Sequence, residues 1–220
     1  MNLDWTNIRT VLLDMDGTLL DLHYDNYFWR EHVPHRYAEY HGIELETART
    51  HLFERFARHS GTLNWYCTDF WSSELALDIV QLKQEVAHLI AVRPDVPDFL
   101  KAVRHSERRV VLVTNAHPDS LDLKMRETGL EPYFDALISS HQIGLPKEHP
   151  DFWHGLQSLE AFDTQHTLFV DDSLPVLRSA QRYGIAHLRA INNPDSRQAQ
   201  KDCGEFAGIS SFLEMMPGGY

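Results

Sequence analysis

Residues 11–18 read VLLDMDGT, a short apolar run that stops abruptly at two acids one residue apart, Asp14 and Asp16. Burying an ionised carboxylate is costly unless it is paired with a cation or bound to a metal. Alternate residues of a strand face the same side, so both carboxylates would point the same way if the strand continued through Asp16. The stretch therefore predicts a buried strand with a cation between two acids at its carboxyl end.

Five short apolar runs rich in β-branched residues predict strands, over residues 10–15, 109–114, 134–139, 166–170 and 185–191. They are almost continuously apolar rather than alternating, which is typical of strands covered on both faces. Helical patterns follow the later runs, over residues 120–128, 150–160 and 175–183, and the first and third of these stop at a glycine. Strands that alternate with helices predict an α/β fold with a Rossmann-like parallel sheet.

More than ninety residues separate the first two predicted strands, although a crossover between parallel strands needs only about a dozen. Most of this gap has the patterning of helices, over residues 27–40, 45–59, 69–77, 79–91 and 97–105. The last of these helices leads into the second strand. We therefore expect an α-helical cap domain, residues 21–92, inserted after the first strand, and an α/β core domain, residues 1–20 and 93–220.

The chain has 220 residues and a formal net charge of −12. This charge argues against a nucleic-acid partner, which would bind a basic face, but a metal or local cations could still hold a small anionic substrate. The two cysteines, Cys67 and Cys203, provide no disulfide framework and favour a reducing compartment. The sequence has neither a signal-peptide layout nor an apolar run of about 18 residues. We expect a cytoplasmic protein without membrane, nucleic-acid or obligate protein partners.

Polar side chains follow four of the predicted strands: Asp14 and Asp16, then Thr114 and Asn115, then Lys147, and finally Asp171 and Asp172. In parallel α/β sheets the carboxyl ends of the strands meet at one edge, where ligands bind. Carboxylates that converge there repel one another unless a hard cation lies between them, and oxygen ligands without Cys or His favour Mg²⁺. A lysine and a threonine at the same place suit phosphoryl oxygens, and a carboxylate can attack phosphorus. This edge therefore predicts a phosphoryl-transfer site.

In order and context, DMDGT at residues 14–18, Thr114, Lys147 and the pair Asp171 and Asp172 resemble the four motifs of the haloacid dehalogenase-like (HAD) phosphohydrolases. The insert after the first strand is similar to their α-helical cap. Five further pieces resemble the bacterial GMP/IMP nucleotidase branch: DNYFW (25–29), TLNWYC (62–67), TNAHP (114–118), PKE (146–148) and NPDS (193–196). The resemblance implies a Mg²⁺-dependent phosphatase that hydrolyses GMP and IMP through an aspartyl-phosphate intermediate.

The resemblance also implies a role for each acid. Asp14 would attack phosphorus, and Asp16 would protonate the leaving 5′ oxygen and then activate water. Asp14, Asp172 and the backbone carbonyl of Asp16 would bind Mg²⁺ directly. Asp171 would bind the ion through water or orient the other ligands.

The remaining motif residues would hold the substrate. Thr114, Asn115 and Lys147 would bind the phosphoryl oxygens, and the turn at Gly17 would offer them backbone N–H donors. A Cβ at Gly17 would obstruct that turn. Glu148 departs from the family pattern, because many members have proline after the lysine.

Fourteen histidines are present, but their pattern does not predict a metal site. The H-E-x-x-H spacing is absent, and Pro34 interrupts the helical spacing between His32 and His35. Most of the histidines are therefore expected at the surface or at the edge of the core. His117 is the exception, because TNAHP places it beside the second strand and makes it a candidate substrate contact.

Aromatic residues cluster in the cap stretch TLNWYCTDFW, residues 62–71. They could form the core of the cap itself, or they could stack on a purine base. In the second interpretation Trp65 is the stacking face, and Asn64 or a backbone amide reads the 6-oxo edge of the base. Asp25, Tyr27 and Trp29 are alternative candidates for these tasks.

Other functions are compatible with the same motifs. A phosphatase of this fold could act on a sugar phosphate or on phosphoglycolate, and a phosphomutase would return the phosphoryl group to its substrate. A haloacid dehalogenase is disfavoured because it would need neither Asp16 nor Mg²⁺. A phosphorylatable receiver-like module also combines Asp, Thr and Lys at a sheet edge, but receivers are much shorter and have no helical insert.

Overall fold

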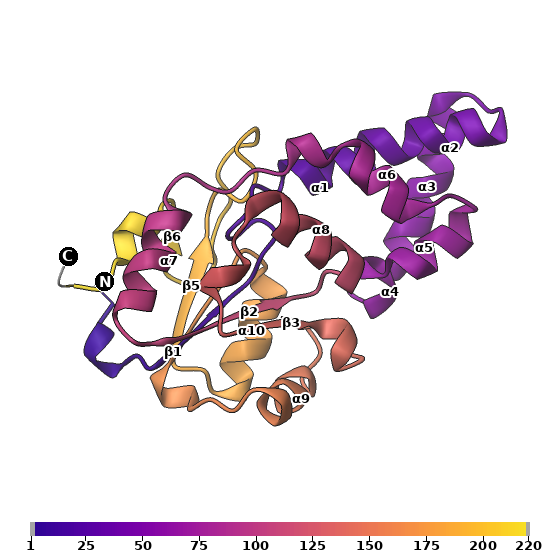
Figure 1. The fold of residues 1–220 in the computed structure, drawn as a ribbon. Coiled ribbons are helices and arrows are strands. Elements are labelled where there is room, and N and C mark those ends of the chain that lie inside the picture. Colours follow the sequence, from indigo (N-terminus) through magenta and orange to yellow (C-terminus); the bar gives the residue numbers. More distant parts are fainter. Residues whose placement is uncertain (1–2, 219–220) are drawn as a thin grey trace.

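In a computed structural model, which describes residues 3–218, the core is a six-stranded parallel sheet with the order β3-β2-β1-β4-β5-β6 (Figure 1). Its strands are β1 (Thr10–Leu13), β2 (Arg109–Thr114), β3 (Ala136–Ser139), β4 (Thr167–Asp171), β5 (His187–Ile191) and β6 (Gly208–Ile209). Every neighbouring pair is parallel. The predicted α/β class is confirmed and the five predicted strands are present. The two-residue strand β6 was not predicted.

The strand order reverses at β1, which lies in the centre of the sheet between β2 and β4. The chain first builds β2 and β3 on one side of β1 and then returns to place β4 on the other side. In such a sheet a crevice opens beyond the carboxyl ends of the two strands where the order reverses, and ligands bind there. The topology therefore points to the ends of β1 and β4 as the place for a site.

Helices cover both faces of the sheet: α7 (Val96–His105), α8 (Pro118–Thr128), α9 (Phe152–Leu159) and α10 (Leu174–Tyr183). Val11 and Leu13 of β1 pack into a cluster with apolar residues of α7 and α8. Leu12, between them, packs into a second cluster with residues of α9 and α10. Successive strand residues face opposite sides, and helices cover both sides of the sheet, so every residue of β1 is buried. This explains why residues 11–13 are all apolar.

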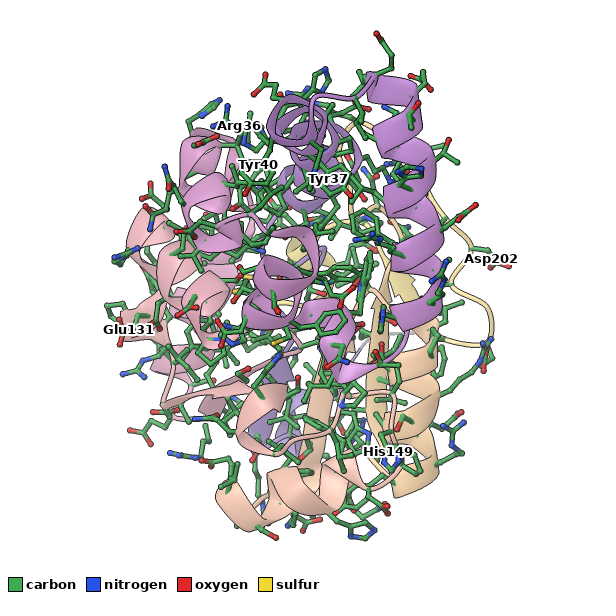
Figure 2. The ribbon with its side chains drawn as sticks, turned by 90° about the vertical axis from the view of Figure 1, so that its right-hand side faces the viewer. Arg36, Tyr37, Tyr40, Glu131, His149 and Asp202 are labelled. Atoms are coloured by element: carbon green, nitrogen blue, oxygen red, sulfur yellow. The ribbon has the colours of Figure 1, made fainter. Side chains whose placement is uncertain are left out.

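Six helices occupy residues 21–92, between β1 and α7: α1 (His23–Tyr27), α2 (Val33–His41), α3 (Leu45–His59), α4 (Leu63–Tyr66), α5 (Thr68–Leu75) and α6 (Ile79–Glu85). They lie away from the sheet, at the upper right of Figure 1. Figure 2 shows Arg36, Tyr37 and Tyr40 at this end of the molecule and His149 at the other end.

The inserted helices have a hydrophobic cluster of their own, which draws on buried residues between positions 24 and 86, including Phe28, Leu52 and Trp71. At its base, Leu20 and Val92 form an antiparallel bridge, so the chain leaves and re-enters the core at neighbouring points. Both observations support the proposal that residues 21–92 form a cap domain.

The helix boundaries of the cap differ from the predicted ones. The helix predicted over residues 27–40 is divided by a π-helical turn, Phe28–His32, that precedes α2. Pro34 lacks an N–H and its ring would clash with the carbonyl four residues earlier, so a local change of helix type accompanies it. The helix predicted over residues 79–91 ends at Glu85 and is followed by a 3₁₀ turn, Ala87–Leu89.

The last part of the chain returns to the sheet. After β6, a 3₁₀ turn (Phe212–Met215) packs on the core, with the rings of Phe212 and Phe99 4.8 Å apart. Trp5 Nε1 donates to the carbonyl of Met215 (3.0 Å) and ties the two ends of the core together. Within residues 3–218, none of the helices has the length and apolar character that crossing a bilayer requires.

Candidate active site

Three carboxylates meet where the strand order reverses. Asp14 follows β1, and Asp171 and Asp172 stand at the end of β4, the strand that pairs with β1. One carboxylate oxygen of each lies within 4.8 Å of the other two. Asp14 is only 5% exposed and Asp171 only 1%, so water screens little of their mutual repulsion. This acidic cluster needs positive charge.

Lys147 supplies part of that charge. Its Nζ donates to Asp14 Oδ1 (2.6 Å), to Asp171 Oδ2 (2.7 Å) and to the backbone carbonyl of Val113 (3.1 Å). Burial alone would lower the pKa of Lys147, but the two carboxylates outweigh burial and raise this pKa. Lys147 is therefore charged at neutral pH and is held in place by three acceptors.

The acidic cluster suits a metal ion. Burial raises the pKa of Asp14, Asp171 and Asp172, each to about 6. Lys147 opposes this rise for the first two carboxyls, and the more exposed Lys201, whose Nζ is 3.0 Å from Asp172 Oδ2, opposes it for the third. Three ionised carboxylates face only two lysine ammonium groups, so the ionised cluster retains unbalanced negative charge. A hard divalent cation fits a set of buried carboxylate oxygens.

The Asp16 carboxylate faces a different cation. Because β1 ends at Leu13 and not at Met15 as predicted, strand alternation does not extend to Asp16. Asp16 Oδ1 accepts from Lys124 Nζ (2.7 Å), which also donates to Asp25 Oδ2 (2.7 Å). Burial and the charge of Asp25 raise the pKa of Asp16 to about 6, while Lys124 opposes the rise. A carboxyl that titrates near neutral pH suits proton transfer.

Gly17 allows the chain to turn directly after Asp16. Its φ is +83°, and a Cβ at this position would lie 2.8 Å from Asp172 Cγ and 3.0 Å from Pro194 Cβ. Only glycine adopts this conformation without strain and admits such a close approach. The residue predicted to open the turn therefore also makes room for an acid of the cluster.

The predicted phosphoryl ligands line one small cavity of about 150 Å³, which is also lined by the acids. The lining includes Thr114, Asn115 and Lys147 together with Asp14, Asp16, Asp171 and Asp172. Asn115 Oδ1 accepts the backbone N–H of Lys147 (2.9 Å), and Thr114 Oγ1 accepts the N–H of Ala116 (3.0 Å). The amide of Asn115 thus positions the loop that carries the lysine.

Glu148 links this loop to the cap. Its Oε2 accepts from Asn115 Nδ2 (2.9 Å), and its Oε1 accepts from the hydroxyl of Tyr66 (2.7 Å). Burial, and then the charge of Glu148, raises the pKa of Tyr66, so the phenol keeps the proton that it donates. The residue that departs from the proline pattern therefore joins the cap to the core beside the acidic cluster.

A larger cavity of about 640 Å³ lies between the cap and the core and adjoins the small one. Four residues line both cavities: Asp16, Leu22, Tyr66 and Ala116. Its wall includes the indoles of Trp29 and Trp65 and the ring of Phe56, with the Trp65 ring 5.9 Å from Trp29 and 5.6 Å from Phe56. A largely apolar cavity of this size is typical of small-molecule sites.

The structure brings only some of the predicted base-binding residues to the larger cavity. Trp65 and the alternative candidates Asp25 and Trp29 line it. Of the other candidates in the described chain, Asn64, Tyr27 and His117 are not among the lining residues. Within the stretch TLNWYC, Trp65 and Tyr66 therefore line the larger cavity, whereas Asn64 does not.

Two buried lysines of the larger cavity, Lys83 and Lys124, were not predicted. Lys124 lies in α8 between the buried residues Leu121 and Met125, and Lys83 follows the buried Leu82 in α6. Lysine is almost never fully buried unless it is paired. A lysine on the apolar face of a helix was therefore the signal that could have identified both.

Comparison with known proteins gives a family match over most of the chain. A family model described as haloacid dehalogenase-like hydrolase matches residues 8–184. The chain is 38% identical over 217 residues to GMP/IMP nucleotidase YrfG of Escherichia coli (strain K12), covering 99% of this chain and 98% of that protein. It is 24% identical over 187 residues to pyrophosphatase PpaX of Bacillus pumilus (strain SAFR-032), covering 81% of each chain.

Solved structures share the fold. The HAD phosphatase from Thermococcus onnurineus superposes with a TM-score of 0.77 at 23% identity, over 94% of this chain and 95% of that chain. CbbY from Rhodobacter sphaeroides, solved in complex with phosphate, superposes with a TM-score of 0.62 at 19% identity, over 94% and 96%. At these identities the structural likeness supports the fold alone.

Proposed function

The chain belongs to the haloacid dehalogenase-like hydrolases, and from this premise we propose that it hydrolyses the purine nucleoside 5′-monophosphates GMP and IMP with Mg²⁺ as cofactor. One observation carries the proposal: a small acidic cavity adjoins a larger aromatic one. The first suits a phosphoryl group and the second a purine base. Membership of a hydrolase family also removes the receiver-like alternative.

The acidic cluster and the neighbouring Asp16 would hold the metal. Asp14 and Asp172 would bind it through their carboxylates, and Asp16 through its backbone carbonyl. Asp171 already accepts from Lys147 Nζ (2.7 Å) and from the N–H of Ser173 (2.7 Å), which supports an orienting role. Bound Mg²⁺ would neutralise phosphoryl oxygens and so favour attack by an anionic group.

In the first step, Asp14 attacks phosphorus as the bond from phosphorus to the 5′ oxygen breaks. Asp16 gives its proton to that leaving oxygen, and the nucleoside departs. Lys147 holds the attacking carboxylate through its bond to Oδ1 and offers positive charge to the phosphoryl oxygens. The raised pKa of Asp16, about 6, lets this carboxyl carry a proton near neutral pH.

In the second step, Asp16 is ionised and removes a proton from water. The water oxygen attacks phosphorus, and the bond between phosphorus and Asp14 breaks. Inorganic phosphate leaves, Asp14 is again a carboxylate, and Asp16 again holds a proton. The Lys124 ammonium beside Asp16 stabilises its ionised form between the two steps.

The larger cavity supports a preference for 6-oxopurines. GMP and IMP present acceptors at O6 and N7, whereas AMP presents an amino donor at position 6. Lys83, only 5% exposed and lining this cavity, carries donors but no acceptor. It would therefore bind the 6-oxo edge and repel the amino group, while Trp65 would stack on the ring. A sugar phosphate or phosphoglycolate would leave the aromatic wall without contacts.

A cytoplasmic location remains part of the proposal. Both cysteines are free thiols, in keeping with a reducing compartment. The proposed substrate is a small anion. Because the chain has a net charge of −12, the local lysines and the metal, rather than the overall charge of the protein, would attract it.

A phosphate-release screen across nucleoside and sugar monophosphates at fixed Mg²⁺ tests the function. We expect the highest kcat/KM for GMP and IMP, and we expect EDTA to abolish turnover because the acidic cluster then lacks its cation. Metal-independent release, or a sugar phosphate that exceeds both nucleotides, would contradict the proposal.

Lys83→Met is expected to reduce the preference for GMP over AMP by about 10–100-fold, the value of a hydrogen bond to a charged group. The matched control is Arg30→Met, which removes an exposed cation from the same cavity. We expect the control to keep the preference of the wild type. Equal ratios of kcat/KM in Lys83→Met and the wild type would assign the base contact to another residue.

Mg²⁺ is expected to raise the melting temperature more at about pH 7.5 than at about pH 5. Asp14, Asp171 and Asp172 have a raised pKa of about 6 in the folded chain, so without metal the folded state loses stability as the pH rises through that value. Mg²⁺ binds the ionised carboxylates, so its stabilising effect grows over the same interval. Thermal-shift measurements with and without EDTA report the rise in melting temperature caused by Mg²⁺, and Asp172→Asn should reduce this rise. A shift that is the same at both pH values would count against this site.

A further inference from the structure

A second group of metal-ligand side chains lies at the junction of cap and core. Cys67 stands between α4 and α5 in the cap, His117 precedes α8, and His141 lies in the 3₁₀ turn Ser140–Gln142 that follows β3. One ligand atom of each lies within 4.8 Å of the other two. Unlike the acidic cluster, this group offers sulfur and nitrogen.

The ring of His141 has a buried nitrogen that is available to bind a metal ion. Its Nε2 is buried and has no hydrogen-bond partner within residues 3–218, and its Nδ1 lies 3.4 Å from Ser139 Oγ. A buried polar atom without a partner is costly, and a native structure that keeps one calls for an explanation such as an ion. A neutral imidazole nitrogen in such a position is a common metal ligand.

His117 is held in an orientation that suits a ligand. Its ring stands edge-on to the ring of His141, with centroids 4.8 Å apart. The hydroxyl of Thr68 lies 2.8 Å from Nδ1 and fixes this ring from the cap side. Histidines that bind metals usually have their second nitrogen engaged in this way. The other nitrogen, Nε2, lies 3.7 Å from Asp69 Oδ2, a nearby carboxylate from the cap.

We propose that Cys67, His117 and His141 bind a transition-metal ion of the Zn²⁺ type, with Asp69 or water as the fourth ligand, and that this ion fastens the cap to the core. Sulfur and imidazole ligands in a four-coordinate set select Zn²⁺ over Mg²⁺. The thiol of Cys67 would lose its proton on binding.

The position of the site means that a bound ion would affect the movement of the cap relative to the core. Cys67 and Asp69 come from the cap, whereas both histidines come from the core, so a bound ion would oppose separation of the two. His117 belongs to the loop that follows Thr114 and Asn115, beside the small cavity. Where release of product requires the cap to move, such an ion would slow turnover.

Titration with Co²⁺ in excess Mg²⁺ tests the site, because the acidic cluster is then occupied and a thiolate bound to Co²⁺ has a charge-transfer band in the near ultraviolet. We expect the wild type to show this band, saturating at a single ion per chain and disappearing when Zn²⁺ is added. Cys67→Ser should lose the band. The matched control is Cys203→Ser, which changes the other cysteine and should keep it.

His141→Asn provides a second variant, in case Cys67→Ser fails to fold. We expect it to keep the thiolate band in altered form and to weaken Zn²⁺ binding by about tenfold or more. Zn²⁺ should also slow amide exchange in residues 63–75 of the wild type and the Cys203→Ser variant, but not of Cys67→Ser.

The proposal is overturned if the wild type shows no band, if Cys67→Ser keeps it, or if Zn²⁺ leaves amide exchange in residues 63–75 unchanged. These spectra and exchange rates do not depend on turnover. The outcome is therefore independent of whether GMP and IMP are the substrates.

Discussion

Asp14→Asn is expected to abolish turnover, with kcat falling by about 10⁴-fold or more, as for other enzymes that lose a nucleophile. An amide is a very poor nucleophile towards phosphorus, so no covalent intermediate can form. The change leaves an oxygen that can still accept from Lys147 Nζ, and it removes one of the buried charges that repel each other in the acidic cluster. We therefore expect the melting temperature in EDTA to stay the same or to rise.

Phosphate release and rapid acid quench measure this result. The wild type should yield a phosphorylated chain and the variant none. The control is Asp122→Asn, which makes the same chemical change at an exposed position of α8 and should have normal activity. Turnover near the wild-type rate in Asp14→Asn would rule out the covalent route.

Lys124→Met is expected to damage both stability and catalysis. Lys124 is 1% exposed and joins the carboxylates of Asp16 and Asp25. Its loss leaves the half-buried carboxylate of Asp16 without its cation, while Asp25 keeps only Lys83, whose Nζ is 3.4 Å from Asp25 Oδ1. Breaking a buried pair typically costs about 3–5 kcal/mol, and we expect a loss towards the lower end of that range. The pKa of Asp16 should rise further, so this residue would still donate a proton but would rarely be ionised to activate water. We expect the second step to slow by about 10²–10⁴-fold, the usual contribution of general base catalysis.

Two measurements separate these effects. Denaturant unfolding reports the loss of stability, and acid quench should show phosphorylated enzyme accumulating, because the first step survives better than the second. In the double variant with Asp25→Asn, one of the two carboxylates that repel each other is gone and part of the stability should return. A loss below about 0.5 kcal/mol, the level of an ordinary surface substitution, would mean that the lysine is not the partner of these acids.

The gathering of acids, a threonine and a lysine at one edge of the sheet could be predicted because these residues occupy fixed places in the sequence pattern. Asp14 and Asp171 come at the ends of strands, and parallel strands bring their carboxyl ends together whatever the connections between them. The pairing of Asp16 with Lys124 could not be predicted in this way. It joins residues 108 positions apart and depends on how one helix turns its face toward a loop.

The cap was harder to predict in detail. Hydrophobic periodicity identified it as helical, but periodicity does not register the π-helical turn before α2. It also does not separate aromatic residues that fill the cap from those that face a cavity. Trp71 is fully buried in the cap core, whereas Trp65, six residues earlier, lines the larger cavity. That difference arises from the packing of α4 and α5 against their neighbours.

The antiparallel bridge between Leu20 and Val92 has a consequence for the inserts that the core can tolerate. The chain leaves the core at Leu20 and returns to it at Val92, and these two residues are neighbours. Residues 21–92 therefore act as one long loop whose two ends are held together. The entropy of closing a loop grows only slowly with its length, so the sheet could accept inserts of other sizes without a change in its register. A different insert could in this way occupy the same point of the chain while the carboxylates at the end of β1 and β4 kept their places.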